Sequence, residues 1–404
     1  MINLKKMAAI IFILMITLAL SSCGRQGDTP AITDDFEITT AAQWVAGIRV
    51  GWNLGNTLDT VGDGSGGFPW LGGGLYANTT VAQMETAWGN PITTRAHITT
   101  LREAGFNAIR IPVSWNKAVC KDFYIREDWM ARVKQVVGYA ADNDMYIILN
   151  THHDNTIFRL LDEHIEDSKF ALERIWSQIA YAFRDHNHKL AFGSLNEPRT
   201  HYSPNEWTGG TPEERSNLNI LNQLFVDTVR ATGGNNAQRV LIIPTYAASA
   251  AAVAQRWLIM PTDTVEDRIV VTLHIYSPWG FALRTGLEGT TPYWDRDNPS
   301  DTRPMLEPLD LAYETFVSNG IPVFIGEMGA LNRGNTQARA QWAEFFVYQA
   351  RLRGMPCFWW DNGIYRVTEL QDWGGWDETF GILNRNANEI AHPEIVEALM
   401  RATS

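Results

Sequence analysis

Short apolar segments recur along this chain at regular intervals, and their number and spacing constrain the fold more than any other feature. Several are nearly unbroken runs of Ile, Val and Leu, a pattern typical of β-strands that are covered on both faces. Amphipathic helices are predicted between them, for example over residues 93–105 and 129–143. Eight strands are predicted in all, over residues 47–52, 108–112, 146–150, 190–195, 240–244, 269–273, 322–325 and 356–360.

Eight strands with intervening helices favour a (β/α)8 TIM barrel, an α/β fold whose active residues lie at the carboxyl ends of the strands. The alternative is an open doubly wound sheet, which usually carries a glycine-rich phosphate turn after its first strand. The chain has no GxGxxG or P-loop sequence, so the barrel is favoured. No linker or repeat interrupts residues 42–404, which predicts one catalytic domain there. Residues 279–308 are rich in Gly, Thr and Pro and are predicted to form a long loop.

The first residues of the chain have the pattern of an export signal. Lys5 and Lys6 precede an apolar run of fourteen residues over 7–20, and Leu-Ser-Ser-Cys then ends at Cys23. This ending resembles a bacterial lipobox, which implies cleavage before Cys23 and lipidation of its thiol. We therefore expect residues 1–22 to be a lipoprotein signal peptide and residues 23–41 to be a lipid-anchored flexible tether. The protein would be exported and held at the bacterial cell envelope, or secreted if the anchor is absent.

The charge balance argues against a nucleic-acid partner. The chain has 33 Lys and Arg against 45 Asp and Glu, a formal net charge of −12, whereas binding phosphates needs a concentrated basic patch. No stretch after residue 22 is long and apolar enough to span a membrane, so contact with a membrane is expected only through the N-terminal anchor. Nothing in the sequence requires more than one copy, and we expect a monomer. The 16 Trp residues are numerous, and flat indole rings suit ligands with apolar faces, sugars among them.

Polar and aromatic side chains cluster at the ends of the predicted strands, which converge on one mouth in a barrel. Two of them, Glu197 and Glu327, are carboxylic acids separated by 130 positions. Two carboxyl groups across a pocket indicate cleavage of a glycosidic bond, with one as acid and the other as nucleophile or base. Arg110 and Tyr276 would stabilise an ionised Glu327. The full set of strand-end candidates is Asn53, Arg110, His152, Asn196, Glu197, His274, Tyr276, Glu327 and Trp360.

The sequence His152-His153-Asp154 raises the alternative of a metal site. In an extended segment adjacent side chains point to opposite sides, so these two histidines are not expected to bind one ion. The HxH and HExxH spacings typical of metal sites are absent, as is the GxSxG turn of a nucleophilic serine. We therefore predict no metal site and no serine chemistry.

Eight motifs in chain order resemble glycoside hydrolase family 5, and its bacterial endoglucanase branch in particular. The similarity extends from about residue 44 to residue 399, almost the whole chain after the predicted signal. The motifs are GWNLGNTLD (51–59), ETAWGNP (85–91), GFNAIRIPVSW (105–115), NTHHD (150–154), SLNEP (194–198), HIYSPW (274–279), IGEMGA (325–330) and FWWDNG (358–363).

The resemblance implies a role for each matching position. Glu197 matches the general acid/base of the family and Glu327 its nucleophile. The remaining matches to active-site positions are Arg110, His152, Asn196, His274, Tyr276 and Trp360. The family retains the anomeric configuration through a covalent glycosyl-enzyme intermediate, and its mechanism needs no metal or organic cofactor.

Some positions keep two interpretations. Asn53 either binds sugar or ties down the first loop, and Trp88 and Trp279 are either sugar platforms or loop packing. Trp359 and Trp360 cannot both face the pocket if the strand alternates, and the resemblance selects Trp360.

The resemblance implies a retaining endo-β-1,4-glucanase that hydrolyses internal bonds of β-glucans. The same chemistry on xyloglucan, mixed-linkage glucan, mannan or xylan remains an alternative, because loops decide the substrate. A more distant alternative is a surface lipoprotein that binds glycans without cutting them. Such a protein would have no reason to keep both glutamates with Arg110 and Tyr276.

Overall fold

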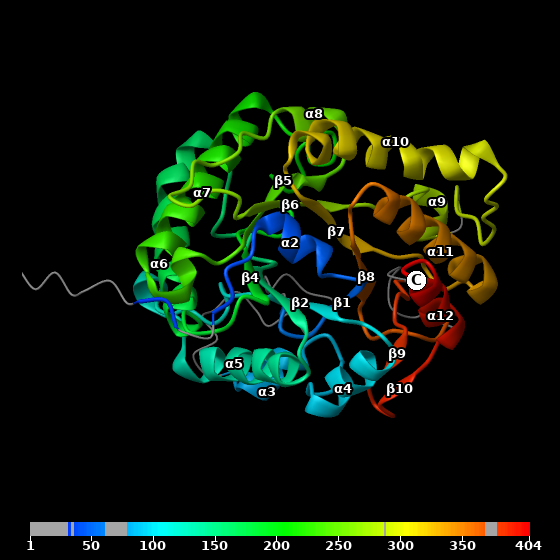
Figure 1. Cartoon of the computed structure of the whole chain (residues 1–404), viewed down its shortest axis with the longest axis horizontal. Helices are drawn as coiled ribbons and strands as arrows, with labels where there is room; N and C mark the ends of the chain where they lie inside the picture. Colours follow the sequence, from blue (N-terminus) through cyan, green and yellow to red (C-terminus); the bar gives the residue numbers. More distant parts are fainter. Residues whose placement is uncertain (1–30, 34–35, 61–78, 287, 368–377) are drawn as a thin grey trace, which may run out of the picture.

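The computed structural model describes residues 31–33, 36–60, 79–286, 288–367 and 378–404. Eight parallel strands form a closed barrel in the order of the sequence, and helices surround it (Figure 1). The strands are β1 (Gly51–Leu54), β2 (Ala108–Val113), β3 (Tyr146–Thr151), β4 (Leu190–Gly193), β5 (Leu241–Ser249), β6 (Ile269–His274), β7 (Val323–Met328) and β8 (Cys357–Asp361). This confirms the predicted (β/α)8 barrel.

The main helices follow the strands in the alternating order of this fold. They are α2 (Ala41–Ala46), α3 (Val81–Glu85), α4 (Arg95–Glu103), α5 (Glu127–Asp142), α6 (Ile165–Ala182), α7 (Pro212–Ala231), α8 (Ala252–Arg256), α9 (Trp279–Ala282), α10 (Pro299–Thr315), α11 (Thr336–Leu352) and α12 (Pro393–Arg401). A two-stranded antiparallel ribbon, β9 (Leu383–Asn384) with β10 (Glu389–Ile390), precedes α12. Within the described ranges, no helix is both long and apolar enough to cross a membrane.

Helix α2 closes the barrel at the amino ends of the strands. Its Trp44 is fully buried and meets the ring of Tyr146 edge-on, with 5.7 Å between the ring centroids. The amide of Ala41 donates to the carbonyl of Asp267, just before β6, at 2.7 Å. Thr40 and Gln43 form a capping box that satisfies the free amides at the start of this short helix. Helix α2 therefore acts as a packed plug of the barrel floor.

The segment just before α2 also lies against this end of the barrel. The amide of Thr33 donates to the side chain of Asn235 at 2.8 Å. Phe36 is buried, next to the ring of His188 and the guanidinium of Arg239. Most of residues 23–41, the predicted tether, lies outside the described residues, but its last part is packed on the protein.

Two details of the strand and loop predictions were wrong. Residues 47–50 precede β1, because Gly47 still ends helix α2. The predicted loop 279–308 contains α9 and the first half of α10. Pro304 and Pro308 suggested a loop because proline lacks the amide that a helix interior uses. Burial of Met305, Leu309 and Ala312 on one face of α10 outweighs that penalty.

We expect Trp44→Ala to lower the free energy of unfolding by about 3–5 kcal/mol, because it leaves a cavity beneath the barrel. Trp257→Ala is the matched control, since Trp257 is 54% exposed, and it should cost about 1 kcal/mol or less. Denaturant unfolding followed by circular dichroism measures both. Equal losses in the two variants would contradict the role of α2 as a packed plug.

Candidate active site

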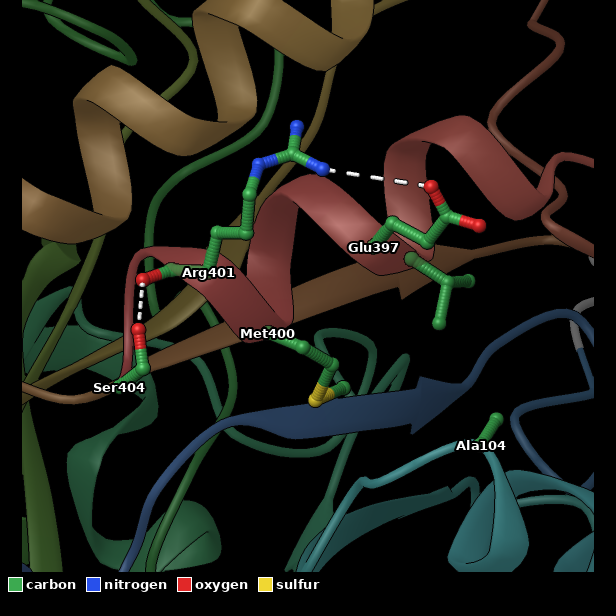
Figure 2. A pocket seen from close by; sticks show the side chains of 6 residues that line it. Ala104, Glu397, Met400, Arg401 and Ser404 are labelled. Carbon is green, nitrogen blue, oxygen red and sulfur yellow. Dashed lines mark hydrogen bonds and ion pairs between the residues drawn. The ribbon is translucent and has the colours of Figure 1, made fainter.

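The predicted strand-end residues lie together at the carboxyl end of the barrel, as the parallel order of the strands requires. A shallow pocket of about 410 Å³ lies at the other end, lined in part by Ala104, Met400 and Ser404 (Figure 2). There Arg401 faces Glu397 at 4.0 Å across one turn of α12. This pocket has no converging carboxylates, so it is not the candidate site.

Arg110 on β2 is the central cation of the site. Its side chain is almost fully buried, and Nη1 donates to Oε1 of Glu327 on β7 at 2.7 Å. Nη1 also donates to Oδ1 of Asn53 at 2.9 Å, and Nη2 donates to the side-chain oxygen of Asn196. One guanidinium therefore fixes side chains from the ends of three other strands. Such a charge-assisted pair is strong in a buried setting.

The second oxygen of Glu327 also has a defined donor. The hydroxyl of Tyr276, just after β6, donates to Oε2 at 3.0 Å. Burial and the negative charge of Glu327 raise the pKa of Tyr276 well above its usual value, so the phenol keeps its proton. Glu327 is thus held by a cation on one oxygen and by a neutral donor on the other.

Glu197, after β4, has different surroundings. Its Oε1 lies 2.8 Å from Nδ1 of His274, and its Oε2 lies 3.1 Å from Nη1 of Arg199. Burial alone would raise the pKa of Glu197, but the hydrogen bond from His274 and the charge of Arg199 outweigh it. The pKa is lowered to about 2. In the free protein Glu197 is therefore a carboxylate with both oxygens engaged.

The two carboxyl groups are close to each other. Nδ1 of His274 also lies 3.6 Å from Oε2 of Glu327. One oxygen of Glu197, one oxygen of Glu327 and a ring nitrogen of His274 all lie within 4.8 Å of one another. Glycosidases that invert configuration separate their carboxyl groups by about 6.5–9.5 Å to admit a water, whereas retaining ones use about 5–5.5 Å. The spacing in this protein matches the retaining class.

His152 and Trp360 form one wall of the site. Their rings are stacked nearly parallel, with centroids 5.6 Å apart and planes 6° apart. Trp359 points away and is buried against Trp342, so the two tryptophans alternate as predicted. Burial lowers the pKa of His152 well below its usual value, and its ring is neutral.

The argument that separated His152 from His153 was wrong in its geometry. β3 ends at Thr151, so the two histidines do not follow strand alternation, and their ring centroids lie 4.3 Å apart. Both Nε2 atoms face Oδ2 of the buried Asp59, at 3.9 and 3.8 Å. One carboxylate and two imidazoles are a ligand set that could hold a cation. Asp59 already accepts the amides of Asn56 and Thr57, which shows that it also fixes the first loop.

The three remaining candidates differ in whether a ligand could reach them: two are held in the hydrogen-bond network around the site, and one is exposed to solvent. Asn53 is fully buried and donates to the carbonyl of Gly326 at 2.9 Å, so it supports the network and does not reach a ligand. Trp88 is partly buried and donates to the carbonyl of Asp59. Trp279, at the start of α9, is 56% exposed and free to meet a ligand from solvent.

Three residues near the site were missed from the sequence. Asp59 and Arg199 are described above. Glu378 is the third, and burial and the charges of Glu327 and Glu197 raise its pKa. Arg199 could have been found because it directly follows the NEP motif. Asp59 ends the GWNLGNTLD motif, but no local pattern links Glu378 to the glutamates.

Comparison with known proteins gives a consistent picture. The model of the family "Cellulase (glycosyl hydrolase family 5)" matches residues 75–366. The chain is 41% identical over 364 residues to cellulase/esterase CelE of Acetivibrio thermocellus, which covers 90% of this chain but only 40% of CelE. This chain thus spans less than half of the length of CelE.

Solved structures match over nearly their whole length. A GH5-4 broad-specificity endoglucanase from Ruminococcus champanellensis, with bound cellotriose, has a TM-score of 0.82 and 40% identity, covering 91% of this chain and 100% of that one. A GH5 xyloglucan-specific endo-β-1,4-glucanase from a metagenomic library has a TM-score of 0.78 and 37% identity, covering 89% and 98%. With the family model matching most of the sequence, this chain belongs to glycoside hydrolase family 5.

Proposed function

We propose that this chain is a retaining endo-β-1,4-glucanase that hydrolyses internal bonds of β-glucans. The observation that carries the proposal is the pair of carboxyl groups at the barrel mouth, with oxygens within 4.8 Å of each other. This spacing leaves no room for a water between the carboxylate and the anomeric carbon, so one carboxylate must attack the sugar itself.

The surroundings of the two carboxyl groups support a different role for each. Glu327 is the more buried of the two, and Arg110 and Tyr276 each donate to one of its oxygens, so we assign it as the nucleophile. Its attack on the anomeric carbon forms a glycosyl ester while Glu197 gives a proton to the departing glycosidic oxygen. Glu197, now a carboxylate, then takes a proton from water, and the hydroxide oxygen displaces Glu327 from the sugar. Two displacements on one carbon restore the starting configuration.

The side chains around this pair position the sugar. Asn196 is fixed by Arg110 and lies next to Glu197, which suits a hydrogen bond to a hydroxyl of the reacting glucose. The stacked rings of His152 and Trp360 offer a flat wall to the same sugar. No step in this scheme requires a metal or an organic cofactor.

The relatives support a β-1,4-glucan as substrate. One similar structure is titled a broad-specificity endoglucanase with bound cellotriose, and another is a lichenase mutant in complex with cellotetraose. Xyloglucan is the second candidate, because a relative of 37% identity is specific for it.

We also propose that the protein is exported and anchored through a lipid on Cys23. The support is the sequence alone: basic Lys5 and Lys6, the apolar run over 7–20 and the lipobox-like ending at Cys23. These residues lie outside the described part of the chain. A single copy of the barrel contains every residue assigned above, in keeping with the expected monomer.

We expect Glu327→Gln to lower kcat by about 10,000-fold or more, because the amide cannot attack the anomeric carbon. Glu197→Ala should keep the first step on an aryl glycoside with an excellent leaving group and then stall as the glycosyl-enzyme. Added azide should restore turnover of Glu197→Ala and yield the β-glycosyl azide, read by NMR. Glu344→Gln, which alters an ion pair on α11, is the control and should leave kcat unchanged. Near wild-type kcat in Glu327→Gln would refute the assignment.

The substrate is tested by reducing-sugar release from a panel of polymers. We expect wild-type protein to act on carboxymethyl cellulose and barley mixed-linkage glucan, with xyloglucan as the next substrate and mannan and xylan far behind. The order of kcat/KM identifies the preferred backbone. If folded protein releases no reducing sugar from any of the five polymers, the glucanase proposal is refuted and glycan binding without cleavage is favoured.

The anchor is tested in cells that express the full chain. We expect the wild-type protein to incorporate labelled fatty acid and to fractionate with membranes, whereas Cys23→Ser should do neither. Cys120→Ser is the matched control, because Cys120 is an exposed thiol in the barrel. Membrane association that persists in Cys23→Ser, without label in the wild type, would indicate an uncleaved anchor instead.

A further inference from the structure

Arg199 is held in one place beside Glu197 by contacts on three sides. Its Nη1 donates to the carbonyl of Glu197 at 2.9 Å and to Oε2 of the same residue at 3.1 Å. Its Nε donates to Glu206 at 3.0 Å. Its guanidinium lies 4.2 Å from the ring centroid of Trp207, and only 13% of its side chain is exposed. A cation so fixed keeps its charge at a constant distance from the carboxyl group.

This arrangement conflicts with what the first chemical step needs. Glu197 must carry a proton before it can give one to the leaving group, yet Arg199 and His274 together occupy both of its oxygens. The second step needs the opposite state, a carboxylate that accepts a proton from water. A nearby cation favours the second state and opposes the first.

Several other charged or titratable groups act on the same carboxyl group. His274 ends β6, Tyr276 follows it, and Glu327 lies on β7. The others are His153 just after β3, His201 after β4 and Glu378 after β8. Tyr276 is neutral, and burial lowers the pKa values of His153 and His201, so these three rings are uncharged near pH 7. Negative charge on Glu327 and Glu378 disfavours the carboxylate form of Glu197, whereas the hydrogen bond from His274 and the charge of Arg199 favour it. Arg110 is bound to Glu327 and Asn196, so Arg199, itself paired with Glu206, is the arginine in direct contact with Glu197.

We propose that Arg199 is a positioning residue that sets the protonation equilibrium of Glu197 and thereby the alkaline limit of activity. This inference rests on the proposed function, since it takes Glu197 as the acid/base. Arg199 makes the carboxylate ready for the second step and makes the protonated acid scarcer as the pH rises. Removing its charge destabilises the carboxylate, so the pKa of Glu197 rises and the acid form persists to higher pH.

The experiment compares pH profiles of kcat/KM for wild type and Arg199→Met on two substrates. Cellopentaose has a sugar leaving group, which must be protonated by Glu197. A 2,4-dinitrophenyl cellobioside has a leaving group that departs without a proton. We expect Arg199→Met to move the alkaline limb on cellopentaose upward by about one pH unit and to leave the limb on the aryl substrate in place.

Two further variants separate charge from structure. Arg199→Lys keeps a cation at this position and should keep the limb within a few tenths of a unit of wild type. Arg215→Met removes an arginine that holds the same segment through the carbonyls of Gly209 and Gly210 without contacting Glu197, and it should not move the limb.

The outcomes are distinct. An unshifted cellopentaose limb in a folded, active Arg199→Met would overturn the inference, as would an equal loss on both substrates at every pH. If Arg199→Met does not fold, Arg199→Gln is measured instead, and an unshifted limb there counts equally against it. Wild-type protein that hydrolyses neither substrate would refute the proposed function itself, before any comparison of limbs.

Discussion

The buried guanidinium of Arg110 is the group on which the rest of the site depends. A charge removed from water is tolerated only when its donors are satisfied and an opposite charge is near. Here β1, β4 and β7 each present an acceptor to it, namely Asn53, Asn196 and Glu327. Each acceptor lies on a strand or just after one. Closing the barrel therefore also fixes the position of Glu327, the proposed nucleophile. Asn53 extends it by donating to the carbonyl of Gly326, next to Glu327.

The second constraint is the difference between two carboxyl groups that share one histidine. His274 lies 2.8 Å from Glu197 and 3.6 Å from Glu327, so it bridges them. Glu327 faces inward to Arg110 and Tyr276, whereas Glu197 faces the segment that carries Arg199. Two groups of the same chemical type therefore share His274 but pair with different arginines, Arg110 and Arg199, which suits a site that places an acid/base beside a nucleophile.

The barrel and most of the site could be predicted from the sequence, for a physical reason. Parallel strands bring their carboxyl ends to one mouth, so the position of a residue at the end of an apolar run can be predicted, as for His274 and Glu327. Glu197 lies four residues after the last residue of β4, and it was placed through its NEP motif. Strand geometry alone does not place residues that lie beyond a strand end. Strand alternation failed for His152 and His153 because β3 ends at Thr151. Helix α10 was not predicted because Pro304 and Pro308 disfavour a helix locally. Its burial against the rest of the protein outweighs that cost, and burial cannot be read from the local sequence.

The position of the N-terminal segment has a consequence for how the enzyme would meet its substrate. Thr33 and Phe36 are fastened to the floor of the barrel, at the amino ends of the strands. Thr33 lies ten positions after Cys23 in the sequence, a stretch that spans at most about 36 Å when fully extended. If Cys23 carries the proposed lipid, the barrel would lie close to the membrane with the amino ends of its strands facing the membrane. The catalytic mouth, at the opposite end of the barrel, would then face away from the membrane.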